Sequence, residues 1–102
     1  MGISIAIVNE NGLKIERIND DKNILHRLLP DHDNDLFSLI NTIDWYGDTV
    51  FNYLQIPLFL DEWNKLPTSI TDDEEQLLIE GVKTMANKVL NNRHLYLKFI
   101  GD

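Results

Sequence analysis

The sequence predicts an α+β domain of two layers, in which helices pack on one face of a mostly antiparallel sheet. A hairpin pattern at residues 3–18, two amphipathic helical patterns at 57–66 and 72–91, and an apolar strand pattern at 95–100 predict this class. Helices and sheets each bury one apolar face, so the two kinds of element pack as separate layers. The chain has 102 residues, which is the length of one domain, and we expect a single domain over residues 1–102.

The first two strands form the clearest local pattern. Residues 3–8 are apolar and rich in isoleucine, and residues 13–18 alternate apolar with charged side chains. Asn11 and Gly12 between them tolerate a positive φ, which is typical of a tight turn. We therefore expect an antiparallel hairpin whose second strand has one solvated face.

The rest of the chain is divided by proline and capping residues. An apolar stripe at 21–29 predicts a short helix that ends before Pro30. Pro57 suits the first turn of the next helix, and Thr71 with Glu74 forms a capping box for the longest one. The expected elements are strands 3–8 and 13–18, a helix at 21–29, strands 36–43 and 49–52, helices 57–66 and 72–91, and a strand at 95–100, which gives the order β-β-α-β-β-α-α-β.

The composition restricts the classes of partner. The 17 acidic and nine basic residues give a formal charge of −8, which disfavours nucleic-acid binding because phosphate contacts need a basic face. No cysteine is present, and no apolar run approaches the roughly 18 residues of a membrane helix. We expect a cytoplasmic chain that does not bind membranes and whose acidic surface attracts a basic protein.

The chain contains no strong motif for a metal, a cofactor or a nucleophile. Asp31, Asp33 and Asp35 have the alternation of a calcium loop, but Leu36 stands where that loop needs Gly and Thr42 where it needs Glu. The three histidines lack metal-ligand spacing, and the glycines do not form a phosphate loop. We therefore expect no metal, no cofactor and no enzyme activity.

Acidic and aromatic residues gather in the middle of the chain. No Lys or Arg occurs between Arg27 and Lys65, whereas seven acids and most of the Trp and Tyr residues do. Tyr and Trp are preferred anchors of protein interfaces, and acids around them would steer a basic partner. The expected partner-binding residues are Asp33, Asp35, Asp44, Trp45, Tyr46, Asp48, Tyr53, Asp61 and Glu62.

Two alternatives remain open for this region. Asp44, Asp48, Asn52 and Gln55 could line a pocket of a small enzyme or ligand-binding protein, since paired carboxylates can divide acid and base roles. Asp44 and Asp48 also flank a turn, where Asp commonly bonds its own backbone. A free sheet edge could alternatively pair with a second copy and form a homo-oligomer.

A resemblance supports the protein-binding alternative. Tyr46-Gly-Asp-Thr-Val-Phe-Asn52, followed by an amphipathic helix, resembles a motif of small bacterial proteins of about this length, and Tyr96-Leu-Lys-Phe-Ile-Gly-Asp102 resembles their closing segment. Small, acidic, cysteine-free chains of this type resemble immunity proteins that neutralise secreted bacterial toxins. The resemblance implies that the basic partner is a toxin domain. Trp45 departs from the proline associated with the motif, which suits a partner-specific surface.

Overall fold

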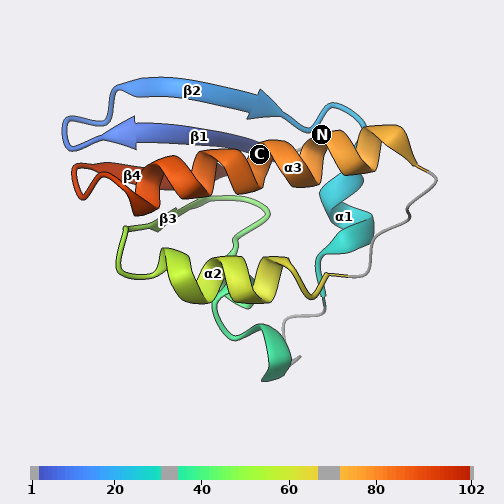
Figure 1. The fold of residues 1–102 in the computed structure, drawn as a ribbon. Coiled ribbons are helices and arrows are strands. Elements are labelled where there is room, and N and C mark those ends of the chain that lie inside the picture. Colours follow the sequence, from blue (N-terminus) through green and yellow to red (C-terminus); the bar gives the residue numbers. More distant parts are fainter. Residues whose placement is uncertain (1–2, 31–34, 67–71, 102) are drawn as a thin grey trace.

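A computed structural model describes residues 3–30, 35–66 and 72–101 and confirms the α+β class. A four-stranded antiparallel sheet carries helices on one face (Figure 1). The elements are β1 (Ser4–Asn9), β2 (Lys14–Asn19), α1 (Ile24–Leu28), the 3-10 helices η1 (Asp35–Phe37) and η2 (Ile40–Thr42), β3 (Asp48–Phe51), α2 (Ile56–Trp63), α3 (Asp73–Leu90) and β4 (Leu95–Ile100).

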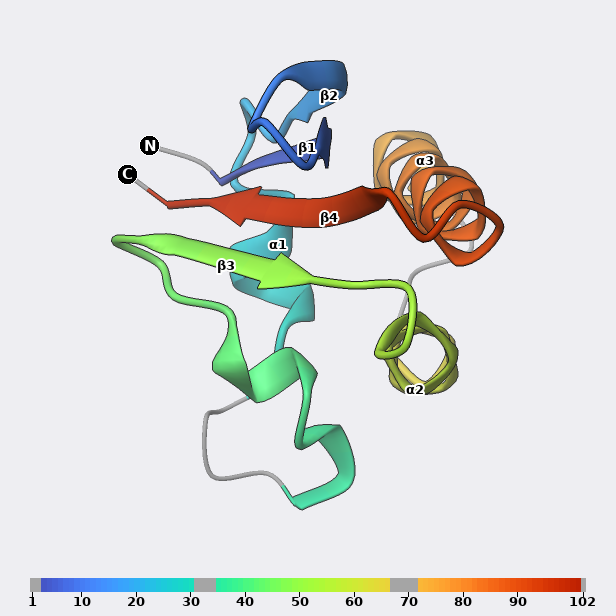
Figure 2. The same cartoon turned by 90° about the vertical axis from the view of Figure 1, so that its left-hand side faces the viewer.

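The strands lie in the order β2-β1-β4-β3, so β4 occupies the middle of the sheet although it follows the other described strands in sequence. Ile5 of β1 lies opposite Ile18 of β2 and Phe99 of β4. These residues share one face because side chains alternate along a strand. That face contacts α3, and Figure 2 shows α2 and α3 on the same side of the sheet.

The core is built around four aromatic rings. Phe51, Phe59, Trp63 and Phe99 have exposed fractions of 1% or less, and their neighbouring centroids lie 5.3–6.3 Å apart. The indole N–H of Trp63 donates to the carbonyl of Ile79 on α3 at 3.3 Å, which satisfies the polar atom of the largest core side chain. Phe51 and Trp63 are therefore core residues.

The predicted hairpin is confirmed, but its connection is longer than a two-residue turn. Gly12 alone has a positive φ there, at 80°. The side chain of Asn9 accepts hydrogen bonds from the N–H groups of Asn11 and Leu13, and the register shifts between Ile7 and Val8. A bulge of this kind turns side chains out of the regular alternation.

Acidic side chains cap the N-termini of α1 and α3. The carboxylate of Asp20 is 4% exposed and accepts from the N–H groups of Ile24 and Leu25, at 2.8 Å each, at the start of α1. Asp72 accepts from the N–H of Glu75 at the start of α3. The expected Thr71 cap lies outside the described residues. Carboxylates are favoured at helix N-termini because they satisfy free N–H groups and oppose the helix dipole.

The predicted strand at 36–43 is wrong, because this stretch forms η1 and η2. Its buried residues are Phe37, Ile40 and Ile43, which recur every third position. A 3-10 helix has three residues per turn, so this spacing places all three on one side, whereas a strand would alternate at every second position. The sheet therefore has four strands, and the order is β-β-α-β-α-α-β with the two 3-10 helices before β3.

Candidate protein-binding surface

The loop of residues 44–48 leads into the edge strand β3. The N–H of Asp44 donates to the hydroxyl of Thr49 at 2.9 Å, and the carboxylate of Asp44 accepts from the N–H of Tyr46 at 2.9 Å. The second bond closes an Asx turn, the local structure that Asp favours in tight loops. The loop is therefore fixed from within by its own side chains.

The end of β4 fixes the same loop from outside. The N–H of Gly101 donates to the carbonyl of Gly47 at 2.7 Å. A side chain at Gly101 would place its Cβ 2.6 Å from Gly47 N and O and from Trp45 O, so only glycine allows this approach. Figure 2 shows the start of β3 and the end of β4 side by side, where Asp48 pairs with Ile100.

Trp45 is half-buried and acts as the support of the loop. Its indole packs against the core and stacks on the ring of His26 from α1, with centroids 4.0 Å apart and an interplanar angle of 10°. No local sequence pattern indicates this contact, because the two rings are 19 residues apart in the chain. The stack ties α1 to the loop.

Tyr46 is the exposed residue of the loop. Its exposed fraction is 85%, the largest among the exposed large hydrophobic residues of the described chain. The backbone on either side is hydrogen-bonded, so the ring projects from a fixed position. Tyr suits an interface anchor because it buries a large area with few rotatable bonds to restrict.

Two carboxylates flank Tyr46. Asp44 is exposed, and Asp48 is paired with Lys98 of β4 at 3.4 Å. The acidic window of the sequence is therefore partly neutralised by a cation from a distant segment. Surface pairs of this kind are weak, so Asp48 keeps part of its influence on an approaching partner.

The other expected partner-binding residues lie elsewhere. Tyr53 follows β3 at its far end, is half-buried and packs against the core. Asp61 is exposed on α2 and pairs with Lys65 at 3.2 Å. Asp33 lies outside the described residues, and Asp35 begins η1. The structure thus brings together Asp44, Trp45, Tyr46 and Asp48. Together with Gly47, these residues form what we call the Tyr46 loop.

Glu62 is corrected from a binding residue to a structural one. Its exposed fraction is 2%, and its carboxylate accepts from the N–H groups of Leu39 and Ile40 at 3.0 and 2.9 Å. The hydroxyl of Ser38 also donates to it, at 3.3 Å. These N–H groups lie at the start of η2, where a helix has no internal acceptor for them. Glu62 therefore caps η2 from α2 and has no surface to offer to a partner.

Three residues of the alternative pocket, Asp44, Asn52 and Gln55, bond within their own turns, and the fourth, Asp48, pairs with Lys98. The carboxylate of Asp44 closes the Asx turn described above. Asn52 N–H donates to the side chain of Gln55 at 2.9 Å, and Gln55 N–H donates to the side chain of Asn52 at 3.1 Å, which closes the turn before α2. These groups stabilise two separate turns instead of converging, which is the arrangement expected from a structural role.

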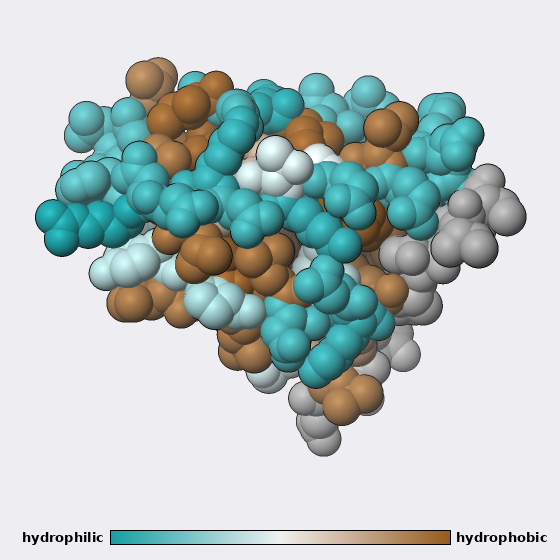
Figure 3. Space-filling model, in the orientation of Figure 1, coloured by the Kyte–Doolittle hydropathy of each residue, from teal (hydrophilic) through white to brown (hydrophobic). Residues whose placement is uncertain are grey.

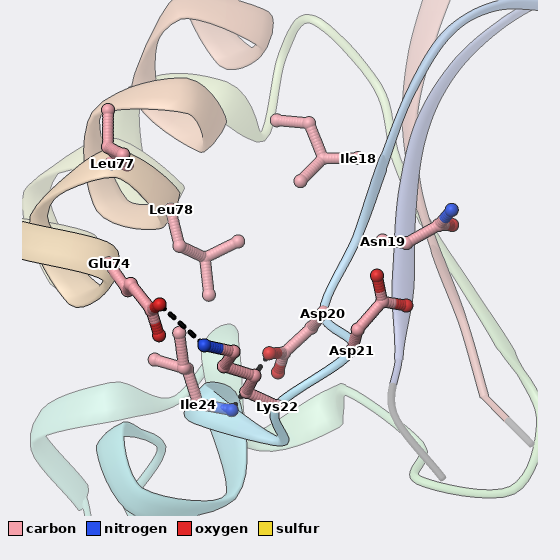
Figure 4. A pocket seen from close by; sticks show the side chains of 9 residues that line it. All are labelled: Ile18, Asn19, Asp20, Asp21, Lys22, Ile24, Glu74, Leu77 and Leu78. Carbon is pink, nitrogen blue, oxygen red and sulfur yellow. Dashed lines mark hydrogen bonds and ion pairs between the residues drawn. The ribbon is translucent and has the colours of Figure 1, made fainter.

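A cavity of about 380 Å³ lies between α3 and the connection from β2 to α1 (Figure 4). No local sequence pattern predicts this cavity, because its walls come from residues 18–24 and 74–78, which are at least 50 residues apart in sequence. Ile18, Ile24 and Leu78 form its apolar side, and Asp21, Lys22 and Glu74 supply charge. Its lining combines apolar walls with charged groups.

Within residues 3–30, 35–66 and 72–101, no three His, Asp or Glu side chains gather as a metal site, and no helix has both the length and the apolar character of a membrane span. Comparison of the chain with known protein families, with curated proteins and with solved structures gave no significant match.

Proposed function

We propose that this chain is an acidic protein-binding module that uses the Tyr46 loop to bind a basic protein. The observation that carries the proposal is the 85% exposure of Tyr46 on a loop held by hydrogen bonds at both ends. A large aromatic side chain on a fixed backbone can be buried by a partner at a low cost in conformational entropy. Such aromatic anchors dominate the binding energy of many interfaces.

The charge of the chain supports a basic partner. The formal charge is −8, and Asp44 and Asp48 flank the anchor. Acidic groups around an anchor raise the association rate with a cationic surface and disfavour anionic competitors. The association rate should therefore fall as the salt concentration rises.

A secreted toxin domain is the partner we propose, in the cytoplasm of the producing cell. The support is the resemblance of Tyr46-Gly-Asp-Thr-Val-Phe-Asn52 to the motif of small bacterial proteins described above, together with the small, acidic, cysteine-free chain. An immunity protein of this kind would cover the active site of its toxin.

The proposal is tested by calorimetric titration of the chain with the purified protein encoded beside its gene. Tyr46→Ala should weaken binding by about 2 kcal/mol, roughly 30-fold, and leave the free energy of unfolding nearly unchanged. Leu13→Ala is the matched control. Leu13 is 64% exposed at the hairpin connection, near the Asn9–Leu95 end of the sheet, whereas the Tyr46 loop contacts Gly101 beyond the other end of β4. Equal affinity of the two variants would refute the role of Tyr46, and absence of binding by the unchanged chain would refute the toxin assignment.

A further inference from the structure

We propose that the cavity between α3 and the β2–α1 connection binds a small organic ammonium ion with an apolar stem, such as a primary alkylamine. This site is distinct from the Tyr46 loop and does not depend on the function proposed above. Its volume of about 380 Å³ falls in the range of small-molecule sites, roughly 300–1,000 Å³.

The apolar side of the cavity is built from three elements. Figure 4 shows Ile18 of β2 and Leu78 of α3 extending into the space, with Ile24 of α1 below them. Leu77 lines the same cavity and is 74% exposed on α3. An exposed leucine beside an apolar hollow gains free energy when a hydrocarbon stem covers it.

The position of Leu77 is unusual for its helix. In Figure 3 hydrophilic residues cover most of the surface along α3, with hydrophobic residues above and below them. Leu77 breaks this pattern beside Glu74 and Glu80, which lie one helical turn away on either side. The rim of the cavity is thus apolar and acidic together, which suits an amphipathic cation better than a neutral or anionic ligand.

The carboxylates around the cavity differ in their availability. Asp20 is buried, and both of its oxygens are bonded to backbone N–H groups of α1. Asp21 is exposed at the rim, and the side chain of Glu74 is 56% exposed. Glu74 and Asp21 are therefore the groups that a positive head could reach.

A cation of the chain already occupies part of this site. The ammonium of Lys22 lies 2.5 Å from Glu74 Oε1 and bridges the β2–α1 connection to α3. The hydrogen bond and the charge of Glu74, with a smaller contribution from Asp72, raise the pKa of Lys22, so this ammonium is charged at neutral pH. The contact shows that an ammonium head fits against Glu74. It also makes Lys22 an internal competitor of any ligand cation.

If Lys22 competes with the ligand for Glu74, removing Lys22 should tighten ligand binding. If Lys22 only holds the site together, removing it should weaken ligand binding. Binding of n-hexylammonium is followed by NMR shifts of the backbone amides, with hexanoate as the anionic counterpart. Lys22→Ala should tighten n-hexylammonium binding by about threefold to tenfold, because Glu74 is freed. Adding Glu74→Gln to that variant should then weaken binding by about tenfold.

The controls separate this cavity from general attraction to an acidic protein. Asp61→Asn removes an exposed, ion-paired carboxylate on α2 and should leave the affinity unchanged. Shifts should concentrate at Ile18, Leu77 and Leu78. Weaker binding by Lys22→Ala, or equal binding of hexanoate, would overturn the proposal. So would binding of Nα-acetyl-arginine amide without n-hexylammonium, which would assign the cavity to a protein side chain.

Discussion

Replacing Glu62 by Ala removes the carboxylate that caps η2 and tests its structural role. In the folded chain this carboxylate is 2% exposed and accepts from the N–H groups of Leu39 and Ile40. The hydroxyl of Ser38 is also bonded to it, but Ser38 is exposed and can turn to water. The substitution therefore leaves two backbone N–H groups without their acceptor beside the core.

The magnitude follows from those two N–H groups. A buried donor that loses its acceptor costs about 1–3 kcal/mol, so Glu62→Ala should lower the free energy of unfolding by about 2–6 kcal/mol. A loss of about 3 kcal/mol would lower Tm by roughly 12 °C or more in a domain of this size. The amides of Leu39 and Ile40 should also exchange with solvent faster.

Urea denaturation followed by tryptophan fluorescence measures the change, and hydrogen exchange locates it. Asp61→Ala is the matched control, because it removes the neighbouring carboxylate on the exposed side of α2. Asp61 forms an exposed ion pair with Lys65 one helical turn away, and such helix pairs contribute about 0.3–0.5 kcal/mol. If Glu62→Ala cost no more than Asp61→Ala, and the two amides exchanged no faster, the capping role would be refuted.

Three further predictions concern the loop and the cavity. Gly101→Ala should destabilise the chain by about 1–3 kcal/mol, because its Cβ would lie 2.6 Å from backbone atoms that no rotamer change can move. Gly81→Ala is its control, since that Cβ meets only the end of one side chain, at 2.9 Å, and urea midpoints should show a smaller change. Trp45→Ala should cost about 2 kcal/mol in thermal or urea unfolding, less than for a fully buried ring, because Trp45 is half-buried. The hydrogen bond from Lys22 to Glu74 raises the pKa of Lys22 above 10.5, so its stabilisation is complete below that pH and is lost as the pH rises through the folded-state value. Urea midpoints of the unchanged chain should therefore fall more steeply above about pH 10.5 than those of a Lys22→Met variant.

The parts of the fold that local sequence could predict are those with a regular period. The hairpin, α2, α3 and β4 were each predicted to within about three residues of their observed bounds. In these segments the apolar spacing, the caps and the prolines all favour the same element. The register of the sheet and the position of β4 between β1 and β3 depend on tertiary packing and had no local signal.

The stretch 36–43 shows why an apolar run alone is ambiguous. Its composition suits a buried strand, but only every third residue is buried, and Leu36 is 69% exposed. The N–H groups that a strand would have paired with a neighbour are satisfied by Glu62 instead. A carboxylate more than 20 residues away in the chain thus stabilises the start of η2.

Only part of the candidate site could be predicted from the sequence, because tertiary contacts determine the role of each of its residues. Asp44, Trp45, Tyr46 and Asp48 are adjacent in sequence, and the structure keeps them together. Their separate roles come from contacts that the sequence does not show: the stack of Trp45 on His26, and the pairing of Asp48 with Lys98. Burial of one aromatic and exposure of its neighbour required the three-dimensional arrangement.

The central place of β4 has a consequence for the synthesis of the chain. Ser4 of β1 pairs with Ile100 of β4, so β1 is synthesised long before its second neighbour exists. Until then β1 and β2 can form only a two-stranded ribbon, and such ribbons are marginally stable in water. Pairing between segments so distant in sequence also slows folding. The edge of β1 therefore stays unpaired until β4 has been synthesised, and a chaperone that covers this edge in the meantime would raise the yield of folded protein.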